Sequence, residues 1–342
     1  MHKPRKQWRY AKHRVISELN ISPHSTCLTR ISMWFKPFSE FIFLIAIVTL
    51  LGCSIRSTET ANTAPSSPKI AAPADLKRAM RAVEPFFSQM PEPKPMDWLA
   101  NFKEPGQTFD EYINDDPTLP TDERKTIYVL PFGKLKPDER ETVNHVAEFL
   151  NAFYGLPIKT LARVELPRDL SPEVFRMRGY PKRRQVKTHY VLQEIMKPRL
   201  PKDAAAMIAL TNEDLYPDDS MSFVFGQASF DDRVGVWSLS RLKDKDAKLF
   251  LTRALKLAAH ETGHMFSIRH CTKYECVMSG SNHIGETDRH PLDACPECMA
   301  KIAWLSKVPP AERYAKLESL CRKFGLLDEA EQFAKKRRAV RF

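Results

Sequence analysis

Three histidines, one glutamate and one cysteine occur within twelve residues, in "HETGHMFSIRHC" (260–271). His260 and His264 are four residues apart, so in a helix they share one face, about one turn apart. Two imidazoles placed in this way can bind one Zn²⁺, and Glu261 beside the first is positioned to transfer a proton. A zinc ion that does chemistry needs a third protein ligand and an open fourth position. His270 can be that ligand if the helix ends soon after His264 and the chain reverses.

A second group of metal-ligand residues follows at once. Four of the seven cysteines form two short pairs, Cys271 with Cys276 and Cys295 with Cys298. Thiolates in such pairs favour a closed tetrahedral zinc site with a structural role. Two disulfides are the alternative, and a redox protein that uses "CPEC" is another. Cys321, on an expected helix face, is interpreted as a buried thiol.

These residues, together with Met278, resemble the archaemetzincin family of the metzincin clan. The family pattern is HExxHxxGxxHC, four residues, Cys, one residue, Met, about seventeen residues and CxxC. The resemblance also reaches upstream, to residues 97–112 and 212–229 and to "VWSLSRL" (236–242), and covers roughly residues 95–305. The matching positions are His260, Glu261, His264, His270, Cys271, Cys276, Met278, Cys295 and Cys298.

The resemblance implies an α/β (α+β) metzincin-like zincin fold. This fold has a twisted, mixed five-stranded sheet, an active-site helix and a small helical C-terminal subdomain. Two zinc ions are implied, a catalytic one at the three histidines and a structural one at the four cysteines. Met278 would form the Met-turn under the catalytic metal. The strand before the helix, "VWSLSRL", would run along the cleft and pair with an extended peptide.

Two departures from the family pattern affect the site. Ser267 replaces the glycine three residues after the second histidine, at a position that often has positive φ, which costs a non-glycine residue about 1–2 kcal/mol. A left-handed serine there would support an intact site. The gap between Met278 and Cys295 is sixteen residues, one short of the usual count. His283 and His290 are expected near the site but not as ligands.

The expected function is hydrolysis of peptide bonds by a zinc metallopeptidase, with Glu261 as general base and a peptide or protein as substrate. The alternative is a catalytically weak or inactive, zinc-stabilised module that binds peptides. Retention of Glu261 favours the enzyme. We expect a monomer.

Hydrophobic periodicity places the motifs on a mixed α/β framework. Strands are expected at 126–133, 158–166, 204–216, 221–230 and 234–242. Helices are expected at 75–90, 137–154, 187–199 and 244–266, and again from 299 onward. The catalytic domain is predicted to span 95–342, with an upper subdomain to about 265 and a lower one over 266–342.

The N-terminal segment (1–53) contains an apolar run, "FIFLIAIVTLLGC" (41–53), that is too short for a comfortable membrane span of about 20 residues. Its end resembles the lipobox of bacterial lipoproteins, which implies acylation of Cys53. An uncleaved anchor helix is the alternative. Residues 54–94 are predicted to be a tether. Both interpretations predict an extracytoplasmic protein attached to a membrane.

The formal net charge is +11, of which residues 1–53 carry +6 through eight Lys/Arg and two acidic residues. The rest of the chain has a mild surplus and no basic stripe interleaved with aromatic residues. We therefore expect no nucleic-acid partner.

Overall fold

A computed structural model of the chain describes residues 69–341 except 168, 181, 230 and 231. The predicted targeting segment 1–53, the acylated Cys53 and the first part of the tether lie outside the described residues. Within the described part, no helix combines the length and apolar character needed to cross a membrane.

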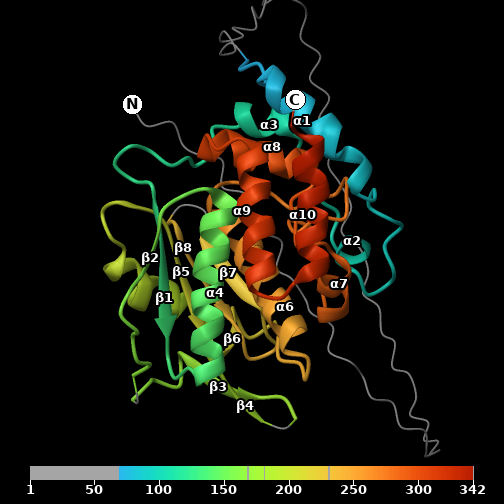
Figure 1. The fold of residues 1–342 in the computed structure, drawn as a ribbon. Helices are drawn as coiled ribbons and strands as arrows, with labels where there is room; N and C mark the ends of the chain where they lie inside the picture. The colour runs from blue at the N-terminus through green and yellow to red at the C-terminus, as the bar shows by residue number, and fades with distance from the viewer. Residues whose placement is uncertain (1–68, 168, 181, 230–231, 342) are drawn as a thin grey trace, which may run out of the picture. The chain divides into compact units, whose positions relative to one another are not determined.

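A five-stranded sheet forms the centre of the folded unit (Figure 1), with the strand order β2-β1-β5-β8-β7. The first four strands are parallel to one another, and β7 pairs antiparallel with β8 at the edge. This arrangement confirms the predicted mixed five-stranded sheet. The strands are β1 (Thr126–Phe132), β2 (Ile158–Thr160), β5 (Ala204–Thr211), β7 (Gly226–Ser229) and β8 (Val234–Ser238).

The central strands are buried on both faces, as parallel strands covered by helices usually are. In β1, Ile127 and Val129 belong to one hydrophobic core, while Tyr128 and Leu130 belong to the other. Every residue of β5 and β8 is buried. A continuous apolar run is therefore needed in these strands, in place of an alternating pattern.

Helices cover the face of the sheet to which Ile127 and Val129 point, which we call the first face. Figure 1 shows α4, α9 and α10 of this layer side by side. Gly155 ends α4 in the left-handed conformation (φ 67°), at the position predicted for the helix end. The helices of this layer are α4 (Pro137–Tyr154), α6 (Ala247–Met265), α8 (Pro296–Ser306), α9 (Pro310–Lys323) and α10 (Leu327–Ala339).

The helix α1 (Ala74–Val83) extends the folded unit at its N-terminal side. It packs on α8 and α10 and buries Leu76, Met80 and Val83 in the same core. The compact unit therefore includes residues from Lys69 onward. The predicted boundary at residue 95 is too late, because the apolar face of this helix needs the C-terminal helices to cover it.

A helical segment at 188–199 covers the second face, next to a small three-stranded sheet. That sheet contains β3 (Phe175–Arg178), β4 (Arg183–Lys187) and β6 (Asp214–Tyr216). The single strand predicted at 204–216 is therefore two strands in two sheets. The Thr211 hydroxyl accepts a hydrogen bond from Glu213 N (3.1 Å), and this local turn redirects the chain.

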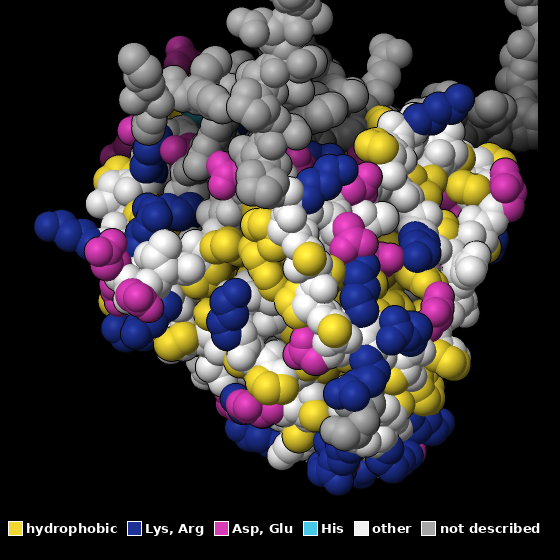
Figure 2. Space-filling view, turned by 90° about the horizontal axis from the view of Figure 1, so that it is seen from above, with side chains coloured by type: hydrophobic (Ala, Val, Ile, Leu, Met, Phe, Trp, Pro, Cys, Tyr) yellow, Lys and Arg dark blue, Asp and Glu magenta, His cyan; other side chains and the backbone are white. Residues whose placement is uncertain are grey.

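Short helices complete the framework: α2 (Trp98–Asn101), α3 (Phe109–Asn114), α5 (Thr188–Tyr190) and α7 (Ile284–Arg289). The strand predicted at 158–166 is limited to β2, with one further bridge at Val164. Over most of the face shown in Figure 2, acidic and basic side chains are interspersed with hydrophobic ones, and several Lys and Arg gather at its lower edge.

Candidate metal centre and active site

The helix α6 presents the first two histidines and then ends as the spacing requires. Asp246 caps its start by accepting a hydrogen bond from Lys248 N (2.8 Å). After Met265 the chain reverses: Ile268 N bonds back to the Gly263 carbonyl (3.0 Å), and Ser267 has φ 62°. The expected left-handed serine is therefore present at the turn that leads to His270.

Ser267 has a partner that offsets part of its backbone strain. Its hydroxyl accepts a hydrogen bond from Thr118 N (3.0 Å). Ser267→Ala would keep the left-handed strain and lose this bond, so we expect a loss of about 1 kcal/mol in the free energy of unfolding. Ser267→Gly loses the bond but also removes the strain, so it should be nearly neutral. Denaturant titration of both variants tests this order, and a less stable glycine variant would contradict it.

The three imidazoles all have their Nδ1 atoms engaged by acceptors. His260 Nδ1 donates to the Val277 carbonyl (2.9 Å), and His264 Nδ1 donates to the Ile268 carbonyl (2.8 Å). His270 Nδ1 lies 2.8 Å from Glu104 Oε2. Since these oxygens can only accept, the ring protons are on Nδ1, and each Nε2 carries a lone pair that can bind a metal.

The Nε2 atoms converge on one point. His260 Nε2 and His264 Nε2 are 2.9 Å apart without a proton between them, an arrangement that a bound cation would stabilise. The three histidines can each offer one nitrogen within a span of 4.8 Å. Burial lowers the pKa of His260 to about 3 and that of His264 well below its usual value. Both rings are therefore neutral at physiological pH, as metal ligands must be.

Two residues that orient His270 were missed from the sequence. Glu104 accepts its Nδ1 proton, and Trp98 packs edge-on against its ring with 5.0 Å between centroids. Both lie in or beside "DWLANFKEPGQ", a stretch noted only for its family likeness. Because 166 residues separate Glu104 from His270, no spacing rule connects them.

We expect Glu104→Gln to weaken zinc binding at the histidines about 10-fold or more, because a neutral amide makes the imidazole a poorer ligand. Glu123→Gln is the matched control, since Glu123 is exposed. Competition with a chelator of known affinity measures the difference. Equal zinc affinities for the two variants would contradict the role assigned to Glu104.

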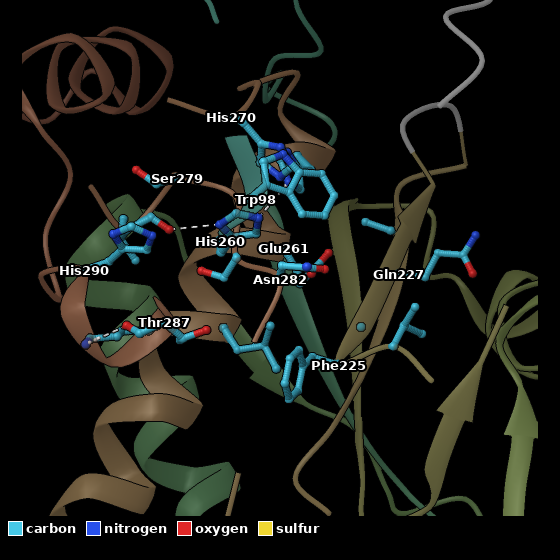
Figure 3. Close-up of a pocket in the computed structure, with 18 of the residues that line it drawn as sticks. Trp98, Phe225, Gln227, His260, Glu261, His270, Ser279, Asn282, Thr287 and His290 are labelled. Carbon is cyan, nitrogen blue, oxygen red and sulfur yellow. Dashed lines mark hydrogen bonds between the residues drawn. The ribbon is translucent and has the colours of Figure 1, made fainter. Parts of the chain in front are cut away.

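Glu261 lies beside the histidines and lines the same cavity (Figure 3). Burial raises its pKa to about 8, and a cation at the histidines would lower it again. A Cβ at Gly226, on β7, would come within 3.2 Å of Glu261 Oε1 and 2.8 Å of the Trp237 Cβ. The edge strand can therefore pass close to Glu261 only because residue 226 is glycine.

The cavity next to the histidines has a volume of about 290 Å³ and lies between α6 and β7. The strand along it is β7, and not the "VWSLSRL" strand predicted from the resemblance. The reason is topological: β8 (234–238) is paired on both sides, with β5 and β7, so its backbone cannot pair with a peptide. Among the described strands that border the cavity, β7 is the one at the edge of the five-stranded sheet.

Met278 packs against the histidine helix α6 at Gly263. It is fully buried, and a Cβ at Gly263 would lie 2.6 Å from its sulfur and 2.8 Å from its Cε. Gly263 is the residue between the two helical histidines that faces this turn. The close approach explains the glycine in "HETGH".

The four cysteines Cys271, Cys276, Cys295 and Cys298 are buried around one centre. Cys271 Sγ and Cys295 Sγ are 3.5 Å apart, close to the roughly 3.8 Å edge of a tetrahedron with Zn–S distances of about 2.3 Å. Cys276 Sγ accepts hydrogen bonds from Met278 N (3.4 Å) and Cys295 N (3.2 Å), which stabilise a thiolate. Among the described residues, none of these cysteines forms a disulfide. Cys321 is a separate buried thiol, as predicted.

One backbone turn connects the two clusters. Cys271 N donates to the Met278 carbonyl (2.8 Å), and the adjacent Val277 carbonyl accepts from His260 Nδ1. The residue before Cys271 is His270. A metal at the cysteines would therefore fix the backbone that positions two of the three histidines.

A third group of possible ligands, Asp97, His283 and Glu286, has its oxygens in use. Asp97 Oδ1 pairs with Arg289 (2.7 Å), and both Glu286 oxygens accept from backbone N–H groups, including that of Trp98. His283 Nε2 lies 3.3 Å from Asp97 Oδ1, in this third group and not among the three converging histidines. This group holds Trp98 in place against His270.

Comparison with known proteins agrees with the geometry. The sequence model of the family described as "Peptidase family M54" matches residues 136–304 of this chain. Archaemetzincin-2 of Homo sapiens is 31% identical over 278 residues, which cover 71% of this chain and 76% of that protein. This chain belongs to the archaemetzincin family. The archaemetzincin of Thermococcus kodakarensis is 30% identical over 184 residues, or 52% of this chain and 95% of that protein.

The crystal structure of archaemetzincin from Methanopyrus kandleri is also similar, with a TM-score of 0.45 and 28% identity over 55% of this chain and 99% of that one. As a member of the archaemetzincin family, peptidase family M54, the protein is a zinc metallopeptidase. The region that matches this family model runs from α4 into α8. The helices α9 and α10 lie beyond it.

Proposed function

We propose that this archaemetzincin hydrolyses peptide bonds with Glu261 as the general base. The observation that supports this most is the placement of Glu261, which lines the cavity beside His260, His264 and His270, each of which offers one ring nitrogen within a span of 4.8 Å. Zn²⁺ held by His260, His264 and His270 supplies a Lewis acid and makes water more acidic. Glu261 accepts the proton of the attacking water and delivers it to the leaving amine.

We propose that the substrate binds as an extended strand along the edge of β7. The open backbone of this strand, from Gly226 to Ser229, borders the cavity that contains Glu261. Main-chain pairing of this kind gives affinity for peptides of many sequences. The side chains on either side of the scissile bond then decide specificity.

The proposal includes two zinc ions, one at the three histidines and one at the four cysteines. The fit of both donor sets supports it: three imidazoles for an open site, and four buried thiols for a closed one. Metal analysis of the purified protein should find two equivalents of zinc per chain. A single equivalent would contradict this part of the proposal.

The activity is tested with a peptide library and the zinc-loaded protein. We expect cleavage that is lost on chelation and restored by zinc. A zinc-stabilised binding module, the alternative, would bind peptides and leave them intact. Binding without cleavage over the whole library would reject the peptidase activity for this chain.

The N-terminal sequence supports membrane attachment through an acylated Cys53, outside the cytoplasm. We expect the full chain, expressed in a bacterium, to incorporate labelled palmitate and to enter the membrane fraction. Cys53→Ser should lose the label. A labelled serine variant would place the modification elsewhere.

A further inference from the structure

The cavity extends beyond the histidines along one stripe of α6. Lys256 and Leu257 line it one turn before His260 and Glu261. One helix turn is about 5.4 Å, so the part of the cavity that Lys256 and Leu257 line, which we call its inner end, lies about that far from the ligand level. A side chain of the bound peptide would reach this end from the scissile bond.

The walls and the inner end differ in chemistry. Leu242, Leu257, Phe225 and Val277 supply apolar walls, whereas Lys256, Thr287 and His290 are polar. Figure 3 shows His290 and Thr287 on the side of His260 that faces away from Trp98 and His270. None of these three polar residues takes part in the proposed hydrolysis.

Lys256 is a buried cation without an ion pair. Its side chain is among the buried charged groups, with the residue 7% exposed. Its Nζ donates to the Thr287 and Asp288 carbonyls (3.1 and 3.2 Å), which leaves a third N–H. Among the described residues no carboxylate lies within 4 Å of this Nζ, and the Asp288 carboxylate is held by Arg253. Burial lowers the pKa of Lys256.

His290 is the second unused group, and it is 6% exposed. Neither ring nitrogen completes a hydrogen bond of good geometry within the described residues, although an interaction with the Gly280 backbone raises its pKa. Burial outweighs this effect and lowers the pKa of His290 to about 4, and the Lys256 charge acts in the same direction. The neutral ring has one N–H to donate.

We propose that the cavity binds an acidic side chain of a residue flanking the scissile bond, whose carboxylate accepts hydrogen bonds from Lys256 Nζ and the His290 ring N–H. A buried cation without an ion-pair partner is costly even when carbonyl groups accept its hydrogen bonds, and a carboxylate is the group that offsets this cost best. A basic side chain would add a second unpaired cation. Since Lys256 lies a full turn beyond His260, glutamate should fit better than aspartate. This inference rests on the proposed peptidase function.

The test compares matched peptides with Glu, Gln, Leu or Lys at each position next to the scissile bond. At one of the two positions, the zinc-loaded protein should cleave the Glu peptide at least 10-fold faster than the Gln peptide, measured as kcat/KM. Lys256→Met should reduce this ratio to about 1, and His290→Leu should reduce it several-fold. Lys248→Met is the control, because it removes an exposed lysine from the same helix and should keep the ratio.

Two results would overturn the inference: no preference of the wild type for Glu, or a preference unchanged in both cavity variants. Failure of the peptidase proposal looks different, because no peptide of any kind would then be cleaved. In that case the affinities of the uncleaved peptides test whether the cavity binds an acidic side chain. The Glu peptide should bind at least 10-fold more tightly than the Gln peptide, and equal binding would reject the inference.

Discussion

Replacing Cys276 by alanine is expected to remove one zinc equivalent and to lower the free energy of unfolding by more than about 4 kcal/mol. The Cys276 sulfur is completely buried and accepts two backbone N–H groups, from Met278 and Cys295. Without it, three thiols remain around a centre that needs four, and both N–H groups lose their acceptor. Metal analysis and denaturant titration measure the two effects.

Cys321→Ala is the control for this change, because it also removes a buried thiol but lies outside the cluster on α9. A loss of about 1–2 kcal/mol with the zinc content unchanged is expected for it. The Cys276 variant should also bind zinc more weakly at the histidines, since the turn at Val277 and Met278 contacts both sites. Similar losses in the two variants, with both zinc ions retained, would argue against a structural metal.

Glu261→Gln is expected to lower kcat by about 10²- to 10⁴-fold while leaving both zinc ions bound. The amide has nearly the shape of the carboxylate, but it cannot accept the proton of water. Glu261 is not one of the proposed zinc ligands, so the metal content should not change. The rate of peptide cleavage and the zinc content are measured on the same preparation. A lower rate with unchanged zinc content indicates loss of the base, whereas a lower zinc content indicates loss of the metal.

The same variant distinguishes an enzyme from a binding module. Peptide affinity should change little, because the apolar walls of the cavity and the edge of β7 remain. If wild type and Glu261→Gln hydrolyse peptides equally slowly and bind them equally well, Glu261 has no catalytic role.

The local features of the site could be predicted because helix geometry fixes them. His260 and His264 lie on one stripe of α6, with Glu261 next to it, wherever that helix stands in the fold. The end of the helix was also predictable, since His270 can reach the same metal only after a reversal. Ser267 adopts the left-handed angle that this reversal requires.

The pairing of strands could not be predicted in the same way. The sequence at 234–238 indicates a buried strand, but burial does not tell which strands lie beside it. The structure places β7 at the edge, and the strand that borders the cleft changes accordingly. The tether boundary has a similar cause, because α1 packs on α8 and α10, two helices that come more than 200 residues later.

The sequence by itself determined the metal-binding chemistry, since residue types at fixed spacing on a helix or in a short pair leave few geometries open. Only the tertiary structure decided what surrounds the metal: Glu104 behind His270, Gly226 beside Glu261, and Lys256 with His290 at the inner end of the cavity. Such neighbours come from distant segments that packing brings together, and no local periodicity relates their positions.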